Sequence, residues 1–148
     1  MVSCELVNAL ESTNIHVNLE NMSEVHRQCA AVIIQDKQGK ILFLEQQNGV
    51  YGIPGGIVDA GETPPMGAMR EAFEEARIEV ELEYIIGTYL LIGGGWPDIF
   101  ASVYKARITR GVPTAGDANE IKSILWRDPN DLPSPLVSDA EAAIQDLL

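Results

Sequence analysis

This chain of 148 residues has little cysteine, few basic residues and no long apolar run. Its two cysteines, Cys4 and Cys29, are too few for a disulfide framework and match no zinc-binding spacing. We therefore expect free thiols in a reducing compartment, the cytoplasm, with a disulfide between the two as the open alternative. No apolar stretch approaches the roughly 18 residues of a membrane span, and no basic segment precedes an apolar run at the start. We expect neither a membrane anchor nor a secretory signal.

Basic residues are outnumbered by acidic ones. Ten Lys and Arg stand against twenty-two Asp and Glu, which leaves a formal net charge of −12. This balance argues against a sequence-independent nucleic-acid binder and against docking on an anionic membrane, since both need clustered cations. If the substrate is itself an anion, a divalent cation is the obvious means of holding it.

The length and the 46% hydrophobic content favour one globular domain. Residues 1–27 form an N-terminal extension in this interpretation, in which residues 5–11 are compatible with a helical turn or two, and residues 28–148 form the domain. Apolar, β-branched runs at 30–34 and 41–44 flank turn residues at 36–40, which predicts a β-hairpin. Residues 51–58 predict a strand interrupted by a tight glycine turn.

The strongest helix signal covers residues 64–76. Thr63 suits the N-cap and Pro64 the first helical position. The predicted apolar face comprises Met66, Met69, Ala72, Phe73 and Ala76. Strands at 80–92, 99–108 and 121–126 follow, and a last helix runs from a cap at Ser138 to the C-terminus. These elements predict an α+β fold, an α/β/α sandwich with a mixed β-sheet between helices.

Three glutamates share one face of the predicted helix. Glu71, Glu74 and Glu75 stand at i, i+3 and i+4, which places neighbouring carboxylates within about 5–6 Å. At about 4 Å, a partly buried pair would repel by about 4 kcal/mol at an effective dielectric constant near 20. Full solvation, protonation or a cation could relieve the repulsion. The preceding glycine pair and Glu62 favour the cation, and hard oxygen ligands suit Mg²⁺ or Mn²⁺.

The segment 56–78 resembles the Nudix box, G-x5-E-x7-R-E-U-x-E-E-x-G-U, where U is an aliphatic residue. The residues that meet the pattern are Gly56, Glu62, Arg70, Glu71, Ala72, Glu74, Glu75 and Ile78. Arg77 departs from it, because the box has glycine there. Glycine at that point commonly ends a helix in the left-handed conformation. Arg77 either adopts this conformation at a cost of about 1 kcal/mol, or the helix ends differently. We expect a changed loop and retained chemistry.

The resemblance implies a pyrophosphohydrolase that uses Mg²⁺, with Mn²⁺ as an alternative, to attack a nucleoside diphosphate linked to another group, such as a nucleotide sugar or a (d)NTP. It implies Glu71 and Glu75 as the principal metal ligands, completed by Glu74 and the backbone carbonyl of Gly55. Arg70 is expected to pair with a glutamate of the box and hold it in register. The catalytic set implied in this way contains Arg70, Glu74, Glu75 and Glu120.

Glu120 lies outside the box, at a position that in the family ligates metal or acts as general base. A solvated glutamate is the equally weighted alternative. For substrate stacking we name Tyr51, Trp96 and Phe100, with ordinary packing as the alternative. Residues 44–47 lack the arginine that many relatives carry near the end of this strand, which indicates a weaker phosphate clamp or one supplied elsewhere.

Two functional classes remain in view. The first is the hydrolase, acting on a small nucleoside diphosphate derivative and not on nucleic acid or membrane. The second is a catalytically silent Nudix-fold module that binds or senses nucleotides. A homodimer is left open by the sequence.

Overall fold

The computed structural model describes residues 6–7, 27–91 and 98–148. Its elements are β1 (Leu6–Val7), β2 (Arg27–Ile34), β3 (Ile41–Gln46), β4 (Tyr51–Gly52), β5 (Gly55–Ile57), α2 (Pro64–Ala76), β6 (Glu79–Leu91), β7 (Ile99–Arg110), β8 (Ile121–Arg127) and α3 (Ser138–Leu147). Leu6 and Val7 pair with the end of β6, so the helical turn expected there is wrong for these two residues. None of the helices in the described ranges is long and apolar enough to cross a membrane.

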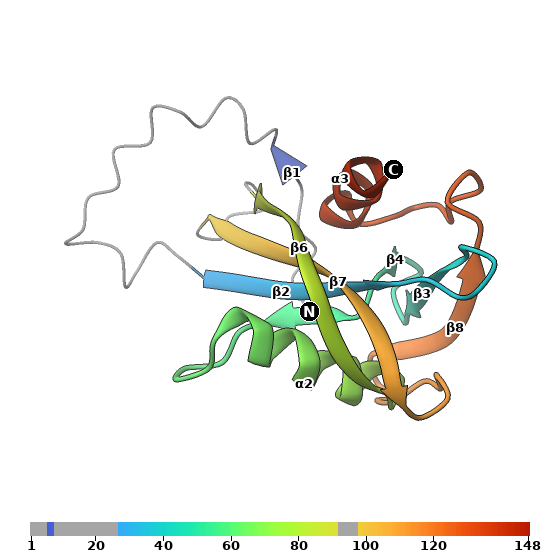
Figure 1. Ribbon diagram of the computed structural model, residues 1–148, viewed down its shortest axis with the longest axis horizontal. Helices are drawn as coiled ribbons and strands as arrows, with labels where there is room; N and C mark the ends of the chain where they lie inside the picture. The colour runs from blue at the N-terminus through green and yellow to red at the C-terminus, as the bar shows by residue number, and fades with distance from the viewer. Residues whose placement is uncertain (1–5, 8–26, 92–97) are drawn as a thin grey trace.

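The strands form two sheets. The larger has the order β1-β6-β7-β2-β5, and the smaller has the order β4-β3-β8. Because β2 and β7 run parallel while the other pairs are antiparallel, the larger sheet is mixed. Helices α2 and α3 lie on opposite sides of it (Figure 1). The predicted α+β sandwich is confirmed.

The hairpin predicted at 30–44 is wrong in one respect. The chain does reverse at Asp36, whose N–H and carbonyl bond to Lys40 and Gly39, but β2 and β3 meet only at an isolated bridge between Gln35 and Ile41. Beyond it they enter different sheets. β2 instead pairs with β7 along its whole length. A strand that is buried on both faces gains more from a neighbour on each side than from one hairpin partner.

Helix α2 packs on β2 through small side chains. Ala68, Ala72 and Ala76 are fully buried in one core cluster with Val32 and Ile34 of β2. The predicted face is therefore wrong in its larger members, since Met66, Met69 and Phe73 are 51%, 38% and 48% exposed. Alanines let the helix approach the sheet closely. That approach brings the glutamates of α2 beside β5.

Helix α3 covers the opposite side, where Ala140, Ala143 and Ile144 are buried. Its N-cap is Val137, without a side-chain hydrogen bond, so Ser138 is the first helical residue and not the cap. The hydroxyl of Tyr89 in β6 donates to a carboxylate of α3, Asp146, at 2.6 Å. This bond ties α3 to the larger sheet.

Candidate active site

Two glycines of β5 allow helix and sheet to meet. A Cβ on Gly55 would lie 2.4 Å from the Cβ of Ala31, its partner in β2. A Cβ on Gly56 would lie 2.6 Å from Oε1 of Glu71. Neither position has room for a side chain. The glycine pair is thus required for close contact between β5, β2 and the carboxylates of α2.

Glu75 is the one buried charged residue in the described ranges, at 3% exposure. The N–H of Gly55 donates to its Oε1 at 2.7 Å. Burial, together with the negative charges of Glu71, Glu120 and Glu74, raises the pKa of Glu75 to about 8, against the opposing effect of the Gly55 hydrogen bond. A buried carboxylate of this kind is held protonated or is compensated by a cation.

Arg70 forms hydrogen bonds with the other glutamates of the box, namely Glu62, Glu71 and Glu74. Its Nε and Nη2 donate to the two oxygens of Glu62 at 2.9 and 3.0 Å, and Nη2 also donates to the carbonyl of Ile57. Its Nη1 donates to Oε1 of Glu71 and to Oε2 of Glu74, each at 3.0 Å. The arginine lowers the pKa of Glu62, whereas burial raises the pKa of Glu71 despite it. Arg70 therefore holds three carboxylates in register.

The loop between β7 and β8 closes the end of α2. The N–H groups of Thr114 and Gly116 donate to the carbonyls of Ala76 and Glu75 at 3.0 and 2.9 Å. These are carbonyls that a helix end leaves without partners. A Cβ on Gly116 would lie 1.8 Å from the carbonyl oxygen of Glu74, so glycine is required at this crossing. The loop is thereby fixed against the helix.

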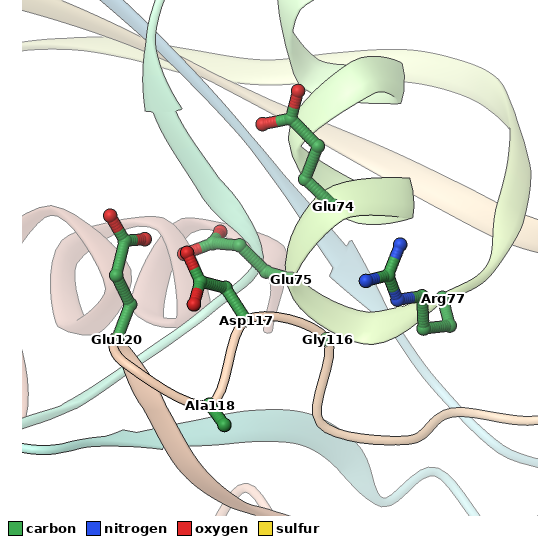
Figure 2. A pocket seen from close by; sticks show the side chains of 7 residues that line it. All are labelled: Glu74, Glu75, Arg77, Gly116, Asp117, Ala118 and Glu120. Carbon is green, nitrogen blue, oxygen red and sulfur yellow. The ribbon is translucent and has the colours of Figure 1, made fainter.

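This contact brings acidic residues of the loop to the glutamates of α2. A cavity of about 390 Å³ is lined by Glu74, Glu75, Arg77, Gly116, Asp117, Ala118 and Glu120. In Figure 2, Glu75 extends from α2 toward the loop that carries Asp117 and Glu120. A second cavity, of about 240 Å³, is lined by Cys29, Gly55, Gly56, Ile57, Glu71, Glu75 and Glu120. Glu75 and Glu120 border both cavities.

Sequence reasoning missed Asp117 and Gly116. The available signal was local: the carboxylate of Asp117 accepts from the N–H of Asn119 at 2.9 Å, as an aspartate at a turn does. Nothing in this turn indicates that it crosses a helix far away in sequence. By contrast, Glu120, for which the sequence left a solvated glutamate as the alternative, borders both cavities with Glu75.

The donor set fits a hard divalent cation in its chemistry, because carboxylate and carbonyl oxygens line the cavities. Within residues 6–7, 27–91 and 98–148, however, no group of three acidic, histidine or cysteine side chains is already placed to hold a metal ion. One reason is that Arg70 forms hydrogen bonds to oxygens of Glu71 and Glu74 and so keeps these carboxylates from facing a common ion. A cation would compete with its guanidinium for these oxygens.

Arg77 ends helix α2 in the left-handed conformation, with φ 57° and ψ 36°. Its N–H donates to the carbonyl of Phe73 at 2.9 Å, as in an ordinary left-handed cap. Of the two alternatives, a left-handed Arg77 or a helix that ends differently, the structure thus shows the left-handed residue. A changed loop relative to the family stays a prediction.

The residues named for stacking lie elsewhere. The hydroxyl of Tyr51, in β4, donates to Glu45 at 3.0 Å, and this contact raises the pKa of Tyr51. Phe100 is half-buried in β7. Neither is among the described residues that line the two carboxylate cavities. Trp96 lies outside the described residues. The structure therefore places neither Tyr51 nor Phe100 at these two cavities.

A mixed sheet between two helices, with a glycine-rich strand against a glutamate-rich helix, is the arrangement that the Nudix resemblance implies. Comparison with known proteins agrees. The family model of the NUDIX domain matches residues 25–147. A MutT-like protein of Streptomyces ambofaciens is 28% identical over 109 residues, covering 73% of this chain and 68% of that protein.

Two further relatives are similar over most of the chain. An ADP-ribose pyrophosphatase of Methanocaldococcus jannaschii is 29% identical over 134 residues, which cover 84% of this chain and 75% of that protein. The crystal structure of a MutT NUDIX hydrolase from Burkholderia pseudomallei superimposes with a TM-score of 0.78 at 26% identity and covers 83% of this chain and 98% of that one. The chain belongs to the Nudix family and is a pyrophosphohydrolase.

Proposed function

We propose that this enzyme hydrolyses the pyrophosphate bond of a nucleoside diphosphate linked to another group, in a reaction that depends on Mg²⁺. The observation that carries the proposal is Glu75, a buried carboxylate beside Glu71 at the junction of two cavities. A fold gains nothing in stability from burying such a charge without a partner. A divalent cation gives it one.

The ligands in this proposal are Glu71 and Glu75, with Glu74 and the carbonyl of Gly55 completing the set. Their hard oxygens suit Mg²⁺, and Mn²⁺ is the alternative. When bound, the cation neutralises the pyrophosphate, orients it and makes water a better nucleophile. This is how a protein with a net charge of −12 could hold an anionic substrate.

The chain's own residues prepare that site. Arg70 keeps Glu71 and Glu74 in position through hydrogen bonds of 3.0 Å. Glu120 stands across the cavities from α2, and its side chain is exposed. We propose Glu120 either as a general base that takes a proton from the attacking water or as an additional ligand. Its position on the loop leaves room for substrate between it and the helix.

The substrate is proposed at the level of its class. The similarity to the MutT-like protein and to the ADP-ribose pyrophosphatase supports a small nucleoside diphosphate derivative, such as a nucleotide sugar or a (d)NTP. Recognition of nucleic acid or membrane is not part of the proposal. A cytoplasmic location, a homodimer and the division into a 1–27 extension and a 28–148 domain stay predictions.

The alternative is a silent Nudix-fold module that binds nucleotides without turnover. Such a module has no need for a cluster of carboxylates that repel one another. Here Glu71, Glu74 and Glu75 are all present, and Arg70 and Gly55 hold them by hydrogen bonds. This arrangement favours the enzyme.

The test is a screen for phosphate release from nucleotide sugars, (d)NTPs, dinucleoside polyphosphates and NADH, with Mg²⁺ and with EDTA. We expect turnover that needs Mg²⁺ and falls at least about a hundredfold in Glu75→Gln, as for other groups that act in the transition state. Glu141→Gln, an exposed change on α3, is the matched control and should retain wild-type rates. Nucleotide binding without any turnover would support the silent module instead.

A further inference from the structure

Arg77 brings a cation to an acidic cavity. Among the described residues that line the two cavities, it is the one with a positive charge. Four carboxylates, those of Glu74, Glu75, Asp117 and Glu120, share its cavity. In Figure 2 the guanidinium lies beside the last turn of α2, at one side of the pocket, and the carboxylates of Glu75, Asp117 and Glu120 lie at the other side.

The guanidinium of Arg77 contacts an aromatic ring and forms no ion pair with a described carboxylate. It lies over the ring of Phe73, 5.7 Å from the centroid, which is the range of a cation–π contact. No carboxylate of the described residues lies within ion-pair distance of it. Arg70 differs, since its three nitrogens are all occupied by glutamates and a carbonyl. Arg77 is the cation that remains available to an anionic ligand.

The backbone at Arg77 makes this placement costly. A non-glycine residue in the left-handed region loses roughly 1–2 kcal/mol. Glycine would end the helix without that loss. Strain retained at the mouth of a cavity is a reason to look for a role of the side chain there.

We propose that Arg77 binds a phosphate group of the substrate and so supplies a clamp that the rest of the site lacks. The inference rests on the proposed function, because it takes a pyrophosphate to occupy this cavity. The end of β3 itself carries Glu45 and Gln46, and the lysine that meets it, Lys122, is paired with Glu45 at 3.3 Å. A guanidinium fork makes charge-assisted hydrogen bonds to phosphate oxygens, often two at once.

The experiment measures binding of inorganic pyrophosphate to the full chain by calorimetry in the presence of MgCl₂. Arg77→Asn removes the charge but tolerates the left-handed backbone, and Arg77→Lys keeps the charge. Arg127→Asn is the matched control, because Arg127 pairs with Asp131 at the far end of β8 and lines neither cavity. Thermal melts establish that all three variants are folded.

We expect Arg77→Asn to raise the Kd about tenfold, the loss of one charge-assisted contact. Arg77→Lys should raise it less, and Arg127→Asn should stay within about twofold of wild type. The dependence of Kd on salt should also weaken in Arg77→Asn, since one ionic contact is gone.

Equal Kd values for Arg77→Asn and Arg127→Asn would overturn the inference, as would a wild-type chain that does not bind magnesium pyrophosphate. The substrate screen separates this result from the proposed function. If Arg77→Asn turns substrate over with an unchanged KM, the proposed hydrolase function stands and the role of Arg77 in phosphate binding is contradicted. If Arg77→Asn binds pyrophosphate more weakly but wild type has no turnover, the role of Arg77 stands and the hydrolase function is contradicted.

Discussion

Replacing Glu75 with glutamine should stabilise the metal-free protein at alkaline pH. Glutamine has the same shape and can still accept the hydrogen bond from the N–H of Gly55 through its carbonyl oxygen. What it removes is a buried negative charge. The effect therefore isolates the cost of that charge from the packing around it.

The magnitude follows from the pKa of Glu75, which is raised from 4.5 to about 8. Below pH 4.5 the folded and unfolded chains are both protonated here, and the group has no effect on stability. As the pH rises from 4.5 to 8, the unfolded chain loses its proton first, so stability falls by about 1.4 kcal/mol per pH unit. Above pH 8 the accumulated cost is on the order of 5 kcal/mol.

Urea unfolding in EDTA at pH 5.5 and at pH 8.5 measures this cost. Glu75→Gln should be more stable than wild type by about 1.4 kcal/mol at pH 5.5, and by about 5 kcal/mol at pH 8.5. Mg²⁺ should then stabilise wild type at pH 8.5 but not the variant. Glu141→Gln, as control, should stay within about 0.5 kcal/mol of wild type at both values.

A Glu75→Gln variant that is no more stable than wild type at pH 8.5 would contradict this prediction. The same holds if the difference between the two proteins did not grow from pH 5.5 to pH 8.5. Either result would mean that the buried carboxylate is already compensated within the metal-free fold.

Three further substitutions test the packing of the site. Gly116→Ala should lower stability by about 2–4 kcal/mol and reduce activity, because its Cβ would overlap the carbonyl oxygen of Glu74; a melt and a rate measurement check both. Gly56→Ala should displace the carboxylate of Glu71 and raise the Mg²⁺ concentration needed for half-maximal rate, and an unchanged requirement would contradict this. Tyr89→Phe should cost about 0.5–1.5 kcal/mol by losing its hydrogen bond to α3, with the rate per folded molecule unchanged.

The sequence predicted the bounds of helices and strands better than it predicted which strands pair with one another. The bounds 64–76 for the central helix agree with the structure, because Thr63 accepts from the N–H of Met66 and a proline begins the helix. The hairpin was wrong because strand pairing depends on a partner distant in sequence, β7, that no local pattern identifies. Sheet order is a property of the whole chain.

The same limit applies to the helix face and to the loop. Periodicity ranks Met69 and Phe73 as core because they are large and apolar, yet the helix buries its alanines and Glu75 in order to reach β5. Recognition of the box supplied Glu71 and Glu75 directly. Asp117 was missed because its place depends on the contact of Gly116 with α2, and the two segments are distant in sequence.

The central claim is that Glu75 is part of a divalent-cation site. The most direct measurement is calorimetric titration of the metal-free protein with Mg²⁺ at pH 7, in two buffers of different ionisation enthalpy. We predict binding to wild type with release of about one proton, since Glu75 must ionise to bind, and no comparable binding to Glu75→Gln. Equal Mg²⁺ affinity in the two proteins, or binding to wild type without proton release, would contradict it.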